Sequence, residues 1–74
     1  MEDSLSKITV REIRAEMGRQ HISQRELADR LEWTQSQLSR RLSGAVRLSM
    51  DDVEAIANEL NVGILQLTVP RARV

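Results

Sequence analysis

Cysteine is missing from this chain of 74 residues, and the aromatic residues are reduced to a single Trp, without Tyr or Phe. Without Cys the chain can form neither a disulfide nor a thiolate zinc site, and the lone His21 cannot build a metal cluster. One Trp does not make a stacking platform for single-stranded nucleic acid. No apolar run approaches the roughly 18 residues of a membrane span. We therefore expect a cytosolic protein without metal or cofactor.

The chain also lacks the length and the residue combinations that catalysis requires. A core of this size leaves stability marginal, with little to spare for an extra catalytic site. Catalysis needs a nucleophile with its base, paired carboxylates in a cleft, or a metal, and none of these can be assembled from this sequence. We expect a non-enzymatic single domain that takes no small-molecule ligand.

Net charge is absent as well, because 11 basic and 11 acidic residues cancel. Their distribution is uneven. Between Trp33 and Met50 there is no acidic residue, whereas Arg40, Arg41 and Arg47 fall in that segment. Positive charge is thus concentrated locally, which fits either a solvated run of Arg or a surface for an anionic partner. The acidic residues that follow directly are Asp51, Asp52, Glu54 and Glu59.

A repeated capping pattern predicts where helices begin. A Ser or Thr N-cap bonds the N3 amide, and a Glu, Gln or Asp side chain at N3 reaches back to the cap. The pattern occurs four times, each time before apolar residues spaced by three, four and seven. The four predicted starts are Thr9 to Glu12, Ser23 to Glu26, Thr34 to Gln37 and Ser49 to Asp52.

Residues that tolerate a left-handed conformation predict where the helices end. Gly18, Gly44 and Asn61 follow the first, third and fourth apolar stripes. Residues 63–69 fit a short fifth helix or a strand, and we favour the helix. Pro70 ends either one.

The second and third predicted helices are separated only by residues 32–34, a connection typical of a helix-turn-helix. Placing Leu38 and Leu42 inward puts a face without acidic residues on the other side of the third helix, roughly Gln35 to Ser43. Gln, Arg and Ser are side chains that read base edges in the major groove. An ordinary solvated helix remains the alternative for this face, although it would more often mix Glu and Lys.

Three segments strengthen this interpretation: Ile22-Ser-Gln-Arg-Glu-Leu-Ala-Asp-Arg-Leu31, Thr34-Gln-Ser-Gln-Leu-Ser-Arg40 with Gly44, and Val53-Glu-Ala-Ile-Ala-Asn-Glu-Leu-Asn-Val62. Together they resemble the Cro and phage-repressor type helix-turn-helix family, also called the xenobiotic-response-element family, from about Val10 to Leu67. The resemblance implies an all-α, compact five-helix bundle of the lambda-repressor-like DNA-binding type, with the helix-turn-helix at about 24–43. We expect an N-terminal arm at 1–8, the DNA-binding domain at 9–69 and a tail at 70–74.

The resemblance also implies which residues contact double-stranded DNA. Glu32 departs from the family's usual Gly, and Arg41 stands where a large apolar residue is usual. Arg41 is either a further phosphate contact or a surface Arg whose stem lies over the core. The expected base-reading residues are Gln35, Ser36, Gln37 and Arg40, and the expected backbone contacts are Gln24, Ser39, Arg41, Ser43 and Arg47.

Regulators of this type commonly dimerise to read two half-sites. The apolar C-terminal run offers an interface, or it completes the core of the monomer. We expect a transcriptional regulator of bacterial or phage type, acting as a repressor in the bacterial cytoplasm or nucleoid. The alternative is a protein-interaction module, such as an antitoxin or adaptor. The interface candidates are Ile64, Leu65, Leu67 and Val69, and Arg11, Glu12, Arg14 and Glu16 are expected to form a solvated face.

Overall fold

The computed structural model describes residues 5–69, in which it has five α-helices and no strand. The helices are α1 (Leu5–Gln20), α2 (Gln24–Leu31), α3 (Gln35–Ser43), α4 (Met50–Leu60) and α5 (Ile64–Thr68). This confirms the all-α, five-helix prediction, including a helix rather than a strand after Gly63. The predicted tail, 70–74, lies outside the described residues.

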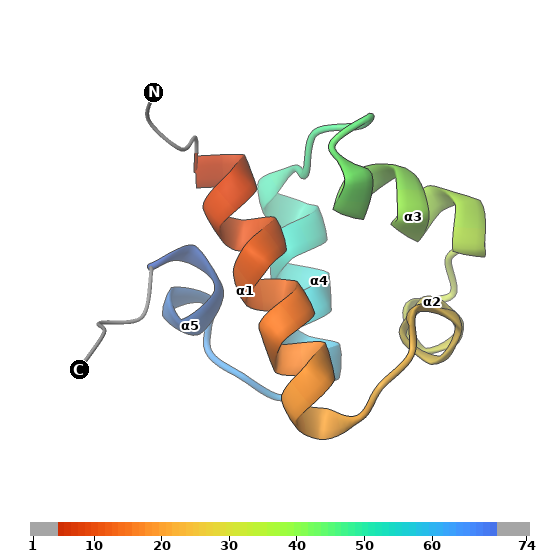
Figure 1. Cartoon of the computed structure of the whole chain (residues 1–74), viewed down its shortest axis with the longest axis horizontal. Coiled ribbons are helices and arrows are strands. Elements are labelled where there is room, and N and C mark those ends of the chain that lie inside the picture. The colour runs from red at the N-terminus through yellow and green to blue at the C-terminus, as the bar shows by residue number, and fades with distance from the viewer. Residues whose placement is uncertain (1–4, 70–74) are drawn as a thin grey trace.

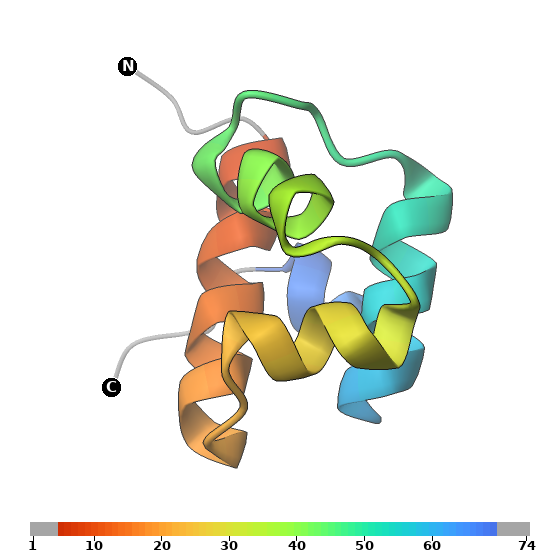
Figure 2. The ribbon, with the colours of Figure 1, turned by 90° about the vertical axis from the view of Figure 1, so that its right-hand side faces the viewer.

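The helices α1 and α4 form the centre of the bundle, with α5 on one side and α2 and α3 on the other (Figure 1). Turned by 90°, the molecule shows α2 crossing in front of α1 and α4, and α3 above it (Figure 2). The helix-turn-helix therefore lies on the opposite side of α1 from α5.

Every helix contributes a fully buried side chain to one core. Burying each of these side chains stabilises the fold by roughly 1.5–3 kcal/mol. The helix α3 has nine residues and is too short to be stable alone, so the burial of Leu38 and Leu42 holds it in place. The largest fully buried residues are Ile13, Leu27, Leu38, Ile56, Leu60 and Leu67.

Three of the four predicted helix starts are confirmed, and the first is wrong. Ser23, Thr34 and Ser49 each accept a hydrogen bond from the N3 amide. Thr9, by contrast, lies inside α1 with 2% of its surface exposed. Thr9 precedes Ile13 by four residues, so it continues the buried face of Ile13 toward the N-terminus. Burial of that face outweighs the cap, and residues 5–8 of the predicted arm are helical.

The helix ends share a motif that we predicted only in part. His21, Glu32 and Asn61 all have positive φ, at 57°, 61° and 60°. In each case the next residue donates its N–H to a carbonyl five residues back: Ile22 to Met17, Trp33 to Ala28 and Val62 to Ala57. This is the Schellman pattern, and the apolar residue that follows packs on the core.

Gly18 was predicted to end α1, but it lies inside that helix, and this prediction is wrong. The helix continues to Gln20 because the apolar residue that packs on the core directly after the helix is Ile22, four residues beyond Gly18. The predictions at Gly44 and Asn61 are confirmed, since both are left-handed C-caps.

The first helix was expected to expose its charged residues, and this is wrong for Glu12 and Glu16. Both are buried, with 9% and 8% of their surface exposed. Glu16 accepts hydrogen bonds from Arg19 and from Gln20, the latter at 2.7 Å, and Gln20 also donates to the Leu60 carbonyl. A polar network thereby joins the end of α1 to the end of α4.

Candidate nucleic-acid interface

The turn between α2 and α3 is fixed by backbone hydrogen bonds from the turn residues to carbonyls of α2. The Glu32 N–H donates to the Asp29 carbonyl at 3.1 Å, and the Trp33 N–H donates to the Ala28 carbonyl at 2.9 Å. Trp33 packs against the core. Glu32 takes the left-handed conformation that glycine adopts without strain. The angle between the two helices is thus set without a glycine.

The helix α3 presents the face that the sequence predicted. Leu38 and Leu42 are buried at 0% and 3% exposure. Gln35, Ser36, Gln37, Ser39 and Arg40 are all exposed. Within the described residues no acidic side chain belongs to α3. The arrangement places amide, hydroxyl and guanidinium groups together on the exposed surface of α3. The helix itself lies at the edge of the bundle (Figure 1).

Gln37 has a structural task in addition to its place on this face. Its Oε1 accepts a hydrogen bond from the Thr34 N–H at 2.8 Å, and Thr34 Oγ1 accepts one from the Gln37 N–H at 3.0 Å. A bidentate pair with adenine needs both the oxygen and the nitrogen of a carboxamide. The cap occupies the oxygen of Gln37, so its Nε2 donors are the groups suited to a ligand. Gln35 has no such role in the cap of α3.

Arg41 connects α3 to α4. Its Nε donates to Asp52 Oδ2 at 3.0 Å, and its Nη1 donates to the Gln37 carbonyl at 2.9 Å. Its guanidinium lies 5.0 Å from the centroid of the Trp33 ring, within the range of a cation–π contact. These contacts favour the second of the two interpretations of Arg41, a side chain lying across the core, over a phosphate contact.

The carboxylate of Asp52 is stabilised in its charged form. Partial burial opposes ionisation and is the largest single effect, but the hydrogen bonds from the Ser49 N–H and from Arg41, with the charge of Arg41, together outweigh it. The pKa of Asp52 is therefore lowered below its ordinary value. Asp52 at once caps α4 and pairs with the end of α3.

The remaining predicted contacts lie at the two ends of the motif. Gln24 is the first residue of α2 and is half-buried. Ser43 Oγ donates to the Arg40 carbonyl at 3.1 Å and accepts from the Ala45 N–H at 3.4 Å, so it shapes the loop after α3. Arg47 is exposed in that loop.

A set of basic residues on α1 was not predicted to belong to this surface. Lys7, Arg11 and Arg14 line an open groove together with Ser43 and Gly44 at the end of α3. Their spacing of four and three residues places them on one helical face. The misplaced helix start hid this pattern, because it assigned Lys7 to the N-terminal arm.

No group of His, Asp or Glu side chains suited to a metal ion is found in residues 5–69. No helix in the same range is long and apolar enough to cross a membrane.

Sequence comparison identifies the family. A search of curated proteins and a search of solved structures each find no significant match. A helix-turn-helix family profile, in contrast, matches residues 10–67, which is most of the chain and spans all five helices. The match agrees with the fold, with the three-residue turn and with the exposed polar face of α3. The chain belongs to the Cro/C1-type helix-turn-helix family, and it is a DNA-binding helix-turn-helix protein.

Proposed function

We propose that the protein is a sequence-specific regulator of transcription that inserts α3 into the major groove of double-stranded DNA. The observation that carries this proposal is the division of α3 into a buried side of two Leu and an exposed side of Gln, Ser and Arg. In a helix-turn-helix the second helix contacts base edges while the first crosses the backbone. The short turn and the docking of Leu38 and Leu42 give α3 a fixed orientation, which base reading requires.

The roles proposed for individual residues follow from their hydrogen-bonding groups. Gln35 and Arg40 supply the bidentate groups that suit adenine and guanine, and Ser36 is an adaptable partner. Gln37 contributes its Nε2 donors. Gln24, Ser39, Ser43 and Arg47 contact phosphates and fix the register without reading sequence.

We further propose that two copies bind two half-sites and that occupancy represses transcription by excluding polymerase or a competing regulator. Of the four residues suggested for the interface, Leu67 is fully buried in the core and Ile64 is half-buried against it. Leu65 and Val69 remain available, at 72% and 52% exposure. This role places the protein in the cytoplasm or nucleoid of a bacterial or phage-infected cell.

Selection from a random double-stranded DNA library tests the proposal. The expected product is an inverted repeat whose binding weakens steeply with salt, because phosphate contacts release counterions. Arg40→Ala is expected to weaken binding by about 1–3 kcal/mol and to relax preference at one base position. Arg19→Gln is the control, since Arg19 lies in the last turn of α1, away from α3 (Figure 1). An unchanged preference for the Arg40 variant would refute its base-reading role.

The neutral net charge favours a second candidate, a module that binds a partner protein through the same fold. Such binding need not depend steeply on salt. Failure of the library to yield any enriched sequence would make this candidate the better one.

A further inference from the structure

The groove beside the end of α3 brings three cations of α1 next to the last residues of α3, and it is distinct from the exposed face of α3 itself. It is lined by Lys7, Arg11 and Arg14 on one side and by Leu42, Ser43 and Gly44 on the other. Arg14 Nη2 donates to the Leu42 carbonyl at 3.2 Å, which fixes α1 to the last turn of α3. The cations of α1 therefore keep a constant position relative to α3.

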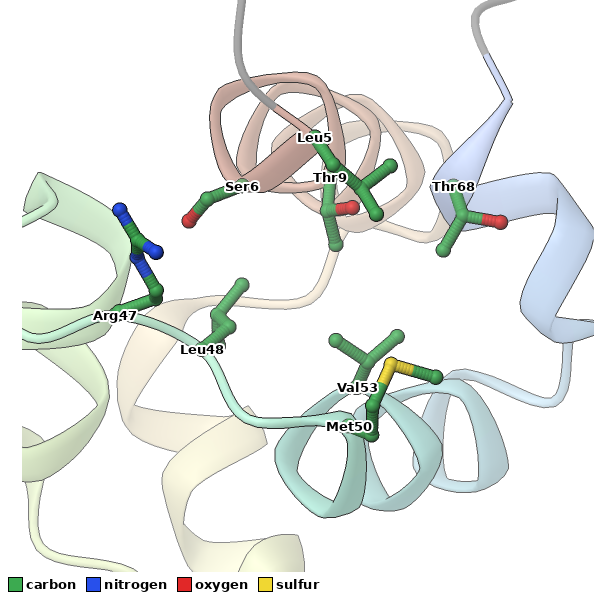
Figure 3. A pocket seen from close by; sticks show the side chains of 8 residues that line it. All are labelled: Leu5, Ser6, Thr9, Arg47, Leu48, Met50, Val53 and Thr68. Carbon is green, nitrogen blue, oxygen red and sulfur yellow. The ribbon is translucent and has the colours of Figure 1, made fainter.

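A second cavity continues this surface toward the loop after α3. Ser6 lines both the groove and the neighbouring pocket, whose wall includes Arg47 (Figure 3). In that view the Arg47 side chain extends from the loop toward Ser6 at the start of α1. The residues Lys7, Arg11, Arg14 and Arg47 thus form one continuous surface, which we call the α1 basic strip.

The composition of the strip matches an anionic polymer. No acidic residue lines the groove or the pocket within the described part of the chain. A chain with no net charge can attract DNA only where its cations are gathered, and the strip gathers four of them.

We propose that the α1 basic strip binds the phosphate backbone of the duplex beyond the bases that α3 reads. This inference rests on the proposed function and adds α1 to the DNA-binding surface. Ser43 and Arg47, at the end of α3 and in its loop, are already proposed to contact phosphates, and the strip extends that row along α1. Because phosphates carry no base identity, the strip contributes affinity and orientation and leaves sequence preference unchanged.

The test is the salt dependence of DNA binding by the double variant Lys7→Gln/Arg11→Gln. Each phosphate contact contributes about 0.9 to the slope of log K against log salt concentration. The double variant is therefore expected to lower the slope by about two. It should reduce the affinity for selected and for random duplexes by the same factor, so that the ranking of sequences by affinity is kept. Arg19→Gln, a charge removed from the far end of the same helix, is expected to leave the slope unchanged. Helical circular dichroism of each variant verifies the fold.

The outcomes separate the two proposals. A slope equal to that of the unmodified protein, with DNA binding intact, overturns the role of the strip and leaves the proposed function standing. A changed ranking of sequences also overturns it, because the strip would then act through the bases. Absence of DNA binding in the unmodified protein overturns both.

Discussion

Arg41 and Asp52 form an ion pair, with Nε and Oδ2 3.0 Å apart, that joins α3 to α4. Both side chains are largely shielded from solvent, at 22% and 17% exposure. The same Oδ2 accepts the Ser49 N–H at 3.0 Å, so one carboxylate oxygen serves both the cap of α4 and the end of α3. The orientation of α3 is thereby linked to the start of α4.

The charge of Asp52 is expected to make this link pH-dependent. The pKa of Asp52 is lower in the folded state. The contribution of its charge to the free energy of unfolding is therefore fully present above the ordinary carboxyl pKa, and it is lost as pH falls through the lowered value. Asp52→Asn is expected to reduce the free energy of unfolding by about 1 kcal/mol at pH 7. The difference from the unmodified protein should shrink on acidification.

Urea unfolding at pH 7 and at pH 3 measures this effect. Asp51→Asn is the matched control, because Asp51 lies in the same first turn but is exposed. It removes only an interaction with the helix dipole, a few tenths of a kcal/mol. If the two variants lost the same free energy of unfolding at both pH values, the pairing of Asp52 with Arg41 would contribute nothing to stability.

Two glycines with equally open surroundings are expected to respond to alanine in opposite directions. A Cβ at Gly18 or at Gly44 meets no atom within 4 Å. Gly18 lies inside α1, so Gly18→Ala should stabilise the protein by about 0.5–1 kcal/mol. Gly44 has φ of 90°, so Gly44→Ala should destabilise it by about 1 kcal/mol. Thermal unfolding of the pair gives the comparison, and shifts of the same sign would contradict the assigned backbone conformations.

Replacing Glu by Gly is expected to have opposite effects on stability at two positions, Glu32 and Glu54. Its φ of 61° places a side chain in the left-handed region, so Glu32→Gly should raise the free energy of unfolding by about 1 kcal/mol. Glu54→Gly, at an exposed helical position of α4, should lower it by nearly as much. The strain at Glu32 would be disproved by a loss of stability in both variants, measured by chemical denaturation.

The sequence predicted the helix-turn-helix well because local signals and core packing agree there. Ser23 and Thr34 cap their helices as expected, and the inward placement of Leu38 settles which side of α3 is exposed. The same agreement holds at Ser49. Where the apolar stripe of a helix begins directly after its cap, the capping signal and the core packing predict the same helix start.

The first helix was predicted poorly because a local signal and the packing disagree. The pattern from Thr9 to Glu12 is a valid capping sequence, but both residues are buried in the folded protein. Gly18 likewise resembles a helix end although the Schellman turn forms at His21. The apolar residue after a left-handed position, here Ile22, is the signal that identifies the true end. The partner of Arg41 could not be predicted, since Asp52 is eleven residues away in another helix.

The two tasks of Gln37 can be separated by a substitution that preserves one of them. Gln37→Glu keeps an acceptor for the Thr34 N–H and puts a carboxylate at N3, where Glu is favoured, so stability should be unchanged or raised by a few tenths of a kcal/mol. The variant loses the Nε2 donors and brings a negative charge to the face of α3 that we propose contacts DNA. Its affinity for the selected duplex should therefore fall, by about tenfold or more.

The fifth helix provides a matched control for this experiment. Gln66 Oε1 accepts the Gly63 N–H at 3.0 Å, which is the same arrangement at the start of α5. Because α5 lies on the other side of α1 from α3, Gln66→Glu should leave the affinity of one copy for a duplex with a single half-site unchanged (Figure 1). Fluorescence anisotropy with labelled duplex measures both variants under one salt condition. Equal affinities for the two would mean that Gln37 only caps α3, and base reading would then rest on Gln35, Ser36 and Arg40.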